Sequence, residues 1–246
     1  MPSRTVLVAP AQSGVLARVR VEEGAAVDKD EALGQLDTRL EELRVERLGK
    51  LANDDVEVRL AAATLAYAKK EEERARRLSE QDIGNLAQLQ KLELETEIAQ
   101  IKLEEARLKQ EIARLTWEEA KARLEQRIIR SPIKGVITTK LKQMGEAVEK
   151  LEPVFRVVSL EPLWIEFNCA VRDEERIEIG TEFRIRRAGR PDTTKTARAI
   201  YKERVVDPSS QTLRVRLKLD NRGRPWKAGR KVLIELVSAG SSTPGK

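Results

Sequence analysis

The feature that most constrains the fold of this chain is a run of residues without proline, from Thr38 to Ile129. Glu, Lys, Arg, Gln, Ala and Leu dominate the run, and these residues favour α-helix. The helical pattern is weak near its middle, at Gln81-Asp82-Ile83-Gly84-Asn85. We therefore expect residues 38–128 to form two long antiparallel helices, a coiled-coil hairpin with its tip near 82–85. Two arms of about 43 residues each would extend about 65 Å.

Apolar residues follow two neighbouring stripes along the second arm. The first stripe has heptad spacing and is interrupted by Glu105 and Glu119; it comprises Leu94, Ile98, Ile101, Leu108, Ile112, Leu115 and Ala122. The second stripe comprises Leu89, Leu92, Ala99, Leu103, Ala106, Ala113, Ala120 and Leu124. Together they predict one wide apolar face for the partner helix. The first arm is less regular, and we expect it to bend or fray at Asn53-Asp54-Asp55.

The segments on either side of this run resemble each other. Pro10–Leu16 is matched by Pro132–Ile137 with one residue fewer, and Val21–Lys29 is matched by Lys142–Lys150. Each copy has short strands separated by a tight glycine turn. We expect residues 1–37 and 129–160 to be two similar halves that pack face to face as a small β-sandwich, with the hairpin inserted between them.

After residue 160 the pattern changes to evenly spaced short strands. Apolar residues alternate from Ile165 to Val171 and again from Leu213 to Leu219, with turns between. This pattern predicts a small antiparallel β-barrel at 161–237. The small residues of 238–246 predict a disordered tail. The predicted fold class is therefore α+β, multidomain and elongated.

The composition excludes several kinds of site. The chain has no histidine and one cysteine, Cys169, so a Cys/His metal site and a histidine-dependent catalytic triad are excluded. Cys169 lies in a strand pattern and is expected to be a small buried residue. The net charge of +6 is spread among interleaved acids and bases, which does not favour nucleic-acid binding. No apolar run has the length of a signal peptide or a membrane span. The chain is thus either cytosolic or a processed form of an exported protein.

The two glycine-turn halves resemble a lipoyl or biotinyl carrier domain. In such carriers a modified lysine lies on the turn that joins the halves. Here Leu36-Asp37-Thr38 and the helical run occupy that place, without a Met-Lys-Met sequence. We therefore expect no carrier role and no cofactor.

Three segments together resemble the periplasmic adaptor proteins, or membrane fusion proteins, of the hemolysin-D-like family. The first is Pro10–Leu36. The second is Ile129-Arg-Ser-Pro-Ile-Lys-Gly-Val-Ile137, close to the family's I-x-A-P-x-x-G-x-V. The third is Val206-Asp-Pro-Ser-Ser-Gln-Thr-Leu-Arg-Val-Arg216 with Asn221 and Lys227-Ala-Gly229, where Ala228 and Arg230 depart from the family's P-G-M.

The resemblance also points to residues at the hairpin tip. Many members that engage a TolC-like outer-membrane channel carry Arg-x3-Leu-x6-Ser there, and Arg74, Leu78 and Asn85 have that spacing, with Asn in place of Ser. The resemblance implies that these residues and Gly84 dock end-on against the channel. The competing interpretation is that Arg74 is one of many solvated arginines and Leu78 the last apolar residue of the hairpin.

The resemblance implies a non-catalytic adaptor of a tripartite efflux or type I secretion system. Such an adaptor bridges an inner-membrane transporter, of ABC, RND or MFS type, and a TolC-like channel, and assembles with its own copies into a hexamer-like ring. It implies no catalytic residue, metal or cofactor, and the lack of His and scarcity of Met argue against a metal-chaperoning subtype.

The expected location is the periplasm, with an inner-membrane anchor in the full-length protein. Few residues lie before Val8 or after Val237, so we expect an expression fragment without the family's membrane-proximal domain. The alternatives are a coiled-coil scaffold without a transport role and a carrier subunit of an enzyme.

Overall fold

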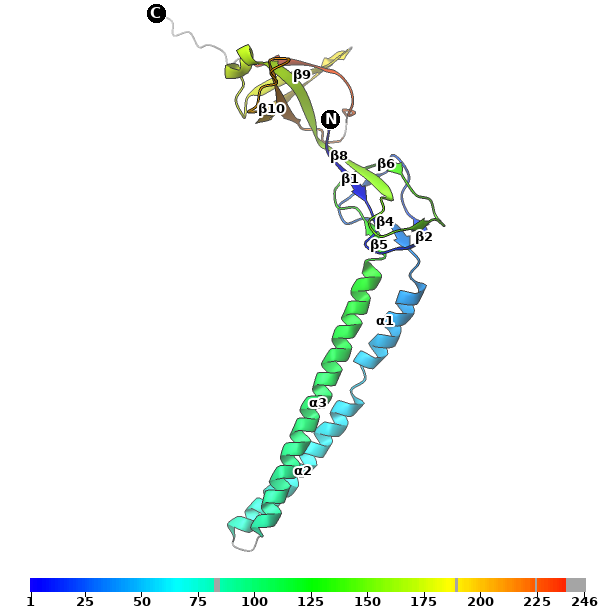
Figure 1. Ribbon diagram of the computed structural model, residues 1–246, viewed down its shortest axis with the longest axis vertical. Helices are drawn as coiled ribbons and strands as arrows, with labels where there is room; N and C mark the ends of the chain where they lie inside the picture. Colours follow the sequence, from blue (N-terminus) through cyan, green and yellow to red (C-terminus); the bar gives the residue numbers. More distant parts are fainter. Residues whose placement is uncertain (82–84, 189, 224, 238–246) are drawn as a thin grey trace, which may run out of the picture. The chain divides into compact units, whose positions relative to one another are not determined.

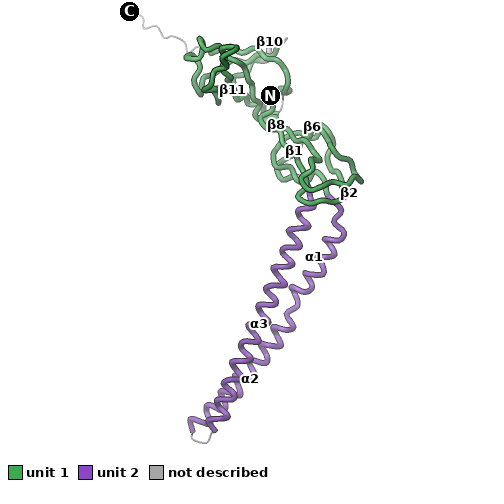
Figure 2. The backbone as a smooth tube through the Cα atoms, in the orientation of Figure 1, with its two compact units in different colours: residues 1–35, 129–246 green, residues 36–128 purple. Residues whose placement is uncertain are grey.

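The computed structural model describes residues 1–81, 85–188, 190–223 and 225–237. The chain forms two compact units, residues 1–35 with 129–246 and residues 36–128 (Figure 2). Gly84 and the tail 238–246 lie outside the described residues. Among the described helices, none has an apolar stretch of the length required to cross a membrane.

The second unit contains three helices, α1 (Arg39–Ala52), α2 (Val56–Glu80) and α3 (Leu86–Glu125). Both α1 and α2 lie along α3, which runs in the opposite direction (Figure 1). With 40 residues, α3 is about 60 Å long. The arm before the tip is thus two helices, and the arm after it is one.

The break in the first arm falls at the weak point seen in the sequence. The side-chain amide of Asn53 donates to the Gly49 carbonyl at 2.8 Å and ends α1. The Asp54 carboxylate accepts from the Val56 backbone N–H at 3.0 Å and begins α2. Short polar side chains compete with helical hydrogen bonds in this way, so Asn-Asp-Asp separates the two helices.

The apolar contact between α2 and α3 uses only one of the two predicted stripes. Leu65 of α2 packs with Ala99 and Leu103 of α3, and mostly small residues surround them, namely Val58, Ala61, Ala62 and Ala68. The heptad-spaced residues of the first stripe are instead exposed, from 44% at Ile98 to 61% at Leu108. The prediction that both stripes form one covered face is therefore wrong. The alanines of α2 fit the small residues of the second stripe, and one neighbouring helix covers only part of the circumference of α3.

The first unit begins with strands that form a sandwich. These are β1 (Pro2–Val8), β2 (Gly14–Val19), β3 (Ala26–Val27), β4 (Ala32–Leu36), β5 (Ile128–Arg130), β6 (Gly135–Lys140) and β7 (Ala147–Val148). One sheet has the order β5-β4-β2-β7. The other sheet contains β3, β6 and the first part of β8 (Phe155–Ala170), which also pairs with β1.

The core of the sandwich agrees with the sequence repeat. Leu16, Leu33 and Leu36 of the first half are fully buried, as are their counterparts Ile137, Val154 and Val157. Gly24 and Gly145 occupy equivalent turns with φ of 86° and 92°, which glycine adopts without steric cost. The two halves therefore have equivalent core positions and equivalent glycine turns.

The remaining strands form the second β part of this unit. They are the end of β8, β9 (Glu182–Arg187), β10 (Arg190–Lys202), β11 (Thr212–Leu219) and β12 (Val232–Leu236), with a 3-10 helix at Val171–Arg176. Their order is β12-β9-β10-β11-β8, and β8 runs without interruption through residue 160. Cys169 is buried in this core, and burial raises the pKa of its thiol. The expected domain boundary thus falls inside one strand that both β parts share.

Candidate docking and assembly surfaces

The hairpin tip carries three of the four residues singled out in the sequence. Arg74 and Leu78 lie one turn apart on one face of α2, and the Leu78 side chain is 50% exposed. The Arg74 guanidinium pairs with Glu71 at 2.7 Å. The fourth residue, Gly84, lies outside the described residues.

Asn85 has a clear local role at the tip. It is the N-cap of α3, with extended backbone, and its side-chain oxygen accepts from the Ala87 N–H at 2.9 Å. An N-cap of this kind satisfies one of the four unpaired N–H groups of a helix start. Serine caps a helix equally well, so the Asn in place of the family's Ser keeps the local structure.

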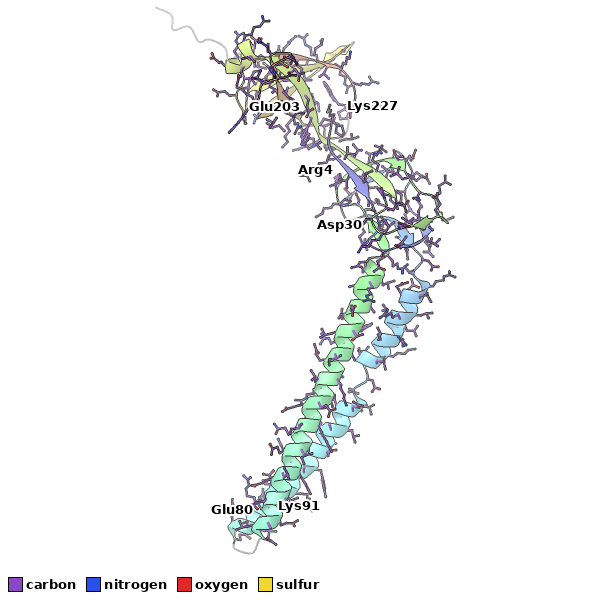
Figure 3. All side chains as sticks on the ribbon, in the orientation of Figure 1. Arg4, Asp30, Glu80, Lys91, Glu203 and Lys227 are labelled. Atoms are coloured by element: carbon purple, nitrogen blue, oxygen red, sulfur yellow. The ribbon has the colours of Figure 1, made fainter. Side chains whose placement is uncertain are left out.

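Sequence reasoning missed an ion pair that ties the two arms together near the tip. The Arg76 guanidinium contacts Glu72 on its own helix at 2.8 Å and Glu93 on α3 at 3.1 Å. Figure 3 draws the side chains along the helices and labels two charged ones, Glu80 and Lys91, close to the tip. Charged residues are frequent on both helices, so the sequence does not distinguish Arg76 from the others. Its contact with Glu93 on the other helix is seen only in the structure.

Charged groups also fasten the base of the helical unit. Arg127 pairs with Glu41 while both side chains are mostly buried, and it donates to the Asp37 carbonyl at 3.3 Å. The Leu36 N–H donates to the Arg127 carbonyl at 2.9 Å. A hydrogen bond from Arg39 lowers the pKa of the Asp37 carboxyl to about 2. The first and last residues of the helical unit are thus held together by an ion pair and by hydrogen bonds.

The exposed heptad residues of α3 form an apolar stripe, interrupted by the charged Glu105, which we call the outer stripe. Its members are Leu94, Ile98, Ile101, Leu108, Ile112 and Leu115. Scattered exposed leucines are ordinary on protein surfaces, whereas a contiguous patch indicates an interaction site. The sequence contained this signal, but the structure is needed to show that the stripe is left uncovered.

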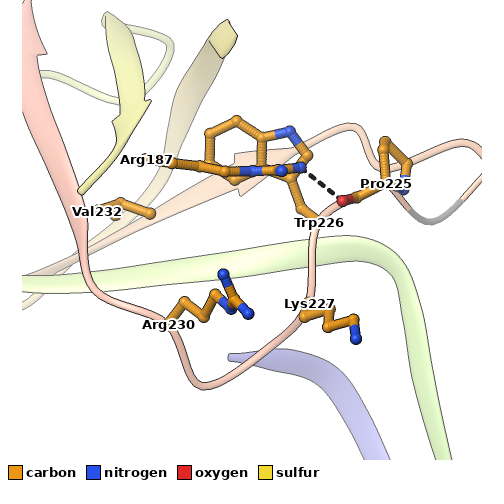
Figure 4. Close-up of a pocket in the computed structure, with 6 residues that line it drawn as sticks. All are labelled: Arg187, Pro225, Trp226, Lys227, Arg230 and Val232. Atoms are coloured by element: carbon orange, nitrogen blue, oxygen red, sulfur yellow. Dashed lines mark hydrogen bonds between the residues drawn. The ribbon is translucent and has the colours of Figure 1, made fainter. Parts of the chain in front are cut away.

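A cavity of about 210 Å³ lies between the end of β9, residues 225–230 and the start of β12 (Figure 4). The Arg187 guanidinium stacks over the Trp226 ring, 4.7 Å from its centre, and donates to the Pro225 carbonyl. Lys227, Arg230 and Val232 complete the lining. Trp226 is in turn held by Asn221, so this wall is built around a buried polar contact.

The described residues hold no cluster of three or more His, Cys, Asp or Glu side chains that would ligate a metal ion. The chemistry on these surfaces consists of ion pairs, apolar patches and helix caps. Such groups suit docking and assembly.

Two family models match the chain in succession. The CzcB-like barrel-sandwich hybrid domain matches residues 4–159, and the CusB-like β-barrel domain matches residues 162–240. The cobalt-zinc-cadmium resistance protein CzcB of Cupriavidus metallidurans is 26% identical over 244 residues, which are 98% of this chain and 44% of that protein. The cation efflux system protein CusB of Escherichia coli K12 is 28% identical over 111 residues, or 45% of this chain and 27% of that protein. This chain therefore spans less than half the length of these relatives.

Solved structures share the fold at low sequence identity. MacA from Actinobacillus actinomycetemcomitans superposes with a TM-score of 0.78 at 16% identity, covering 96% of this chain and 75% of that one. The membrane fusion protein Spr0693 from Streptococcus pneumoniae R6 gives 0.63 at 15% identity, covering 96% and 95%. The barrel-sandwich model alone accounts for more than half of the residues, and the chain belongs to the family of CzcB-like and CusB-like membrane fusion proteins.

Proposed function

We propose that this chain is part of a non-catalytic periplasmic adaptor in a tripartite efflux system. In that role it bridges an inner-membrane transporter and a TolC-like outer-membrane channel. The observation that carries the proposal is the succession of a barrel-sandwich match and a β-barrel match over nearly the whole chain. The relatives' names, a resistance protein and a cation efflux protein, favour an adaptor over a coiled-coil scaffold without a transport role.

Within the adaptor we assign three functional parts. Residues 1–37 and 129–160 form the lipoyl-like domain, residues 38–128 the coiled-coil hairpin, and residues 161–237 the β-barrel domain. The long α3 and the fixed base of the helical unit support a spacer role for the hairpin. Assembly into a hexamer-like ring belongs to the same proposal.

The transported substrate is proposed from the relatives. CzcB is named for cobalt, zinc and cadmium resistance, and we assign this adaptor to a pump for divalent cations of that kind. The test is growth of the source cell, with and without the full-length gene, in graded concentrations of each metal salt. Loss of resistance on deletion and its recovery on complementation are expected. Unchanged growth in all three metals would contradict the assignment.

Docking of the channel is assigned to the hairpin tip, at Arg74, Leu78, Gly84 and Asn85. Leu78 is an exposed apolar residue beside an arginine, and Asn85 orders the start of α3. Leu78→Asp should abolish cross-linking of a tip cysteine to the channel. The matched control is Leu60→Asp, since Leu60 is an exposed leucine of the same helix, 68% exposed and remote from the tip. Asn85→Ser preserves the cap and should retain docking. Equal loss in both leucine variants would count against a tip-specific site.

A further inference from the structure

The cavity of Figure 4 is lined by three positively charged side chains that come from two separate segments. Arg187 is the last residue of β9, and it pairs in register with Val232, the first residue of β12. The loop before β12 therefore lies beside the end of β9, and Lys227 and Arg230 belong to that loop. Strand pairing thus brings together cations that are distant in the sequence.

A tight turn fixes the spacing of Lys227 and Arg230. Ala228 and Gly229 form the centre of this turn, and Gly229 has a φ of 83°. A type II turn requires a positive φ at that position, and glycine adopts it without steric cost. The Cα atoms of the first and fourth residues of a β-turn lie within about 7 Å of each other. The two charged side chains therefore start from neighbouring points, and both line the cavity.

The wall beside these two side chains is held in place. The Arg187 guanidinium stacks over the Trp226 ring and donates to the Pro225 carbonyl. Trp226 is 5% exposed and is hydrogen-bonded to the fully buried Asn221. Arginine has five N–H donors, and the bond to Pro225 uses one of them. Arg187 is therefore positioned before a ligand arrives, and a positioned group loses little conformational entropy on binding.

No carboxylate neutralises the charges around the cavity. Among the described side chains, Lys227, Arg230 and the adjacent Lys231 have no ion pair, and no acid lines the cavity. Like charges repel, so this grouping lowers the stability of the empty site, and a bound anion would remove the repulsion. Other cations of the same β part do have acidic partners, namely Arg186 with Glu235, Arg216 with Glu166, and Arg222 with Asp220.

Arg230 is also a departure from the family's sequence pattern. That pattern has P-G-M at this turn, whereas this chain has Ala228, Gly229 and Arg230. A methionine would place an apolar group on the cavity wall. The arginine instead supplies a planar fork of N–H groups that can bind two oxygens of one anion. The charge at this position therefore belongs to this chain's own sequence.

The donor set favours a doubly charged oxyanion. A phosphate monoester carries about −1.5 to −2 elementary charges at pH 7 and has three strong acceptor oxygens. Arginine and lysine are its usual protein ligands. The cavity of about 210 Å³ is several times the volume of about 30 Å³ that one water molecule occupies in the liquid. A carboxylate has a single charge and two oxygens, so it would leave more of the positive charge without a partner.

We propose that Arg187, Lys227 and Arg230 form a binding site for a phosphate group, either free phosphate or the headgroup of a lipid. In this site Arg230 binds two phosphate oxygens, Lys227 adds a second charge from the same turn, and Arg187 contributes from β9. The bound anion connects β9 to the loop before β12 and stabilises this β part. This inference goes beyond the proposed function and does not depend on a transport role.

Calorimetric titration of the full chain with inorganic phosphate tests the site, with the ionic strength held constant by sodium chloride. Saturable binding of one phosphate per chain is expected. Arg230→Met restores the residue of the family pattern and should weaken phosphate binding by about tenfold or more. The matched control is Arg222→Met. Arg222 is an exposed arginine of the same loop that pairs with Asp220 and does not line the cavity, so the affinity for phosphate should stay unchanged.

Two further measurements locate the phosphate. The indole N–H resonance of Trp226 should shift with phosphate in an NMR titration, while those of Trp117 and Trp164 stay in place. Phosphate should also raise the Tm of the natural chain, because a ligand that binds the folded state stabilises it. Arg230→Met should lose both effects while keeping the circular dichroism of the natural chain. If that variant does not fold, Lys227→Gln carries the same test.

Vesicles distinguish free phosphate from a lipid headgroup. Flotation would compare phosphatidylcholine vesicles with and without phosphatidic acid. Binding to phosphatidic acid that Arg230→Met loses and Arg222→Met keeps would assign a lipid headgroup. Saturable phosphate binding without vesicle binding would assign free phosphate. Vesicle binding that both substitutions weaken equally would show a general attraction to a basic surface and would overturn the proposal. Phosphate binding that does not saturate, or that Arg230→Met leaves unchanged, would overturn it as well.

Discussion

Asn221 shows how one buried side chain can organise a wall of the β-barrel. It is fully buried, and its amide donates to the carbonyls of Leu160 and Trp226, both at 3.0 Å, while its oxygen accepts from the Trp226 N–H at 3.0 Å. All the hydrogen-bonding groups of this side chain except one lone pair are thereby engaged. The sequence reading placed Asn221 in a family pattern without a reason for it. The structure supplies the reason, which is the fastening of two separate segments.

The first prediction follows from these contacts. Asn221→Asp keeps the acceptor but loses both donors, and its ionised form would face two carbonyl oxygens in a buried place. We expect a loss of about 3 kcal/mol or more in the free energy of unfolding at pH 7. Burial raises the pKa of the introduced acid in the folded state. Stability should then be highest below the unfolded pKa of about 3.9 and be lost as the pH rises.

Asn221→Ala is the matched control for that pH dependence, because it removes the same hydrogen bonds without adding an ionisable group. Urea unfolding of both variants between pH 4 and about 8 would measure the difference. Parallel pH profiles for the two variants would contradict the account of a buried carboxylate.

The second prediction concerns the loop that begins at Asp207. Its carboxylate accepts from the Ser209 hydroxyl at 2.6 Å and the Ser209 N–H at 2.9 Å, and these bonds lower the pKa of Asp207. A lowered pKa contributes stability above the unfolded pKa, and this contribution is lost as the pH falls through the folded value. Ser209→Ala should move the pKa of Asp207 up toward its ordinary value. An NMR titration of the carboxyl carbon measures it, and an unchanged pKa would exclude the hydroxyl as a cause.

At the level of single residues, the sequence indicated what kind of residue belongs in the core better than it indicated which side chains face inward. It correctly indicated that Cys169 is a buried small residue. Val15 and Leu16 are neighbouring aliphatic residues whose side chains point to opposite faces of a strand, and the sequence does not tell which of the two faces inward. In the structure Leu16 is fully buried and Val15 is 46% exposed. Only the packing of the second half against the first decides between them.

Among the secondary-structure elements, α3 shows why periodicity alone is insufficient. Both of its stripes are apolar and have helical spacing, so either could face the first arm. The choice depends on the size of the opposing residues, and the alanines of α2 accept the smaller stripe. The sequence therefore predicted the existence of the helices, and the weak point at 53–55, better than it predicted their contact face.

The third prediction concerns the approach of strand β6 to β8. A Cβ atom added at Gly135 would lie 2.5 Å from the Val158 carbonyl oxygen and 2.9 Å from its carbon. Backbone cannot move aside as a flexible side chain can, so Gly135→Ala should destabilise the sandwich by about 2 kcal/mol or more. Chemical denaturation with tryptophan fluorescence and circular dichroism provides the measurement.

Gly145→Ala is the control for this substitution. An added Cβ at Gly145 would meet nothing within 4 Å, and only the positive φ of 92° opposes it. We expect a smaller loss of about 1 kcal/mol there. If the two variants lost equal stability, steric exclusion by Val158 would not explain the requirement for glycine at 135.

For the molecule as a whole, the most informative feature of the sequence was the order in which its segments follow one another. The Pro10–Leu36 segment, the helical run, the Ile129–Ile137 segment and the run from Val206 are individually weak signals. Their succession predicted the family that the domain models then matched. The substrate could not be predicted, because the described residues hold no cluster of metal-ligating side chains that would indicate one. Assembly was equally hidden, since it depends on which surfaces remain uncovered after folding.

The fourth prediction treats residues 37–127 as an insertion that the rest of the fold does not need. Leu36 and Arg127 are hydrogen-bonded at 2.9 Å, and Ser131 exchanges backbone bonds with Asp30 and Glu31 at 2.8 and 2.9 Å. Strands β4 and β5 are therefore antiparallel neighbours. Replacing residues 37–127 with Asn-Gly, a two-residue hairpin turn, should leave a folded β protein, because that turn matches the twist of the flanking strands. A dispersed amide NMR spectrum and a cooperative unfolding transition are the expected results. A collapsed spectrum would instead mean that the helical unit contributes to the stability of the sandwich, and the sandwich would then not be independent of its insertion.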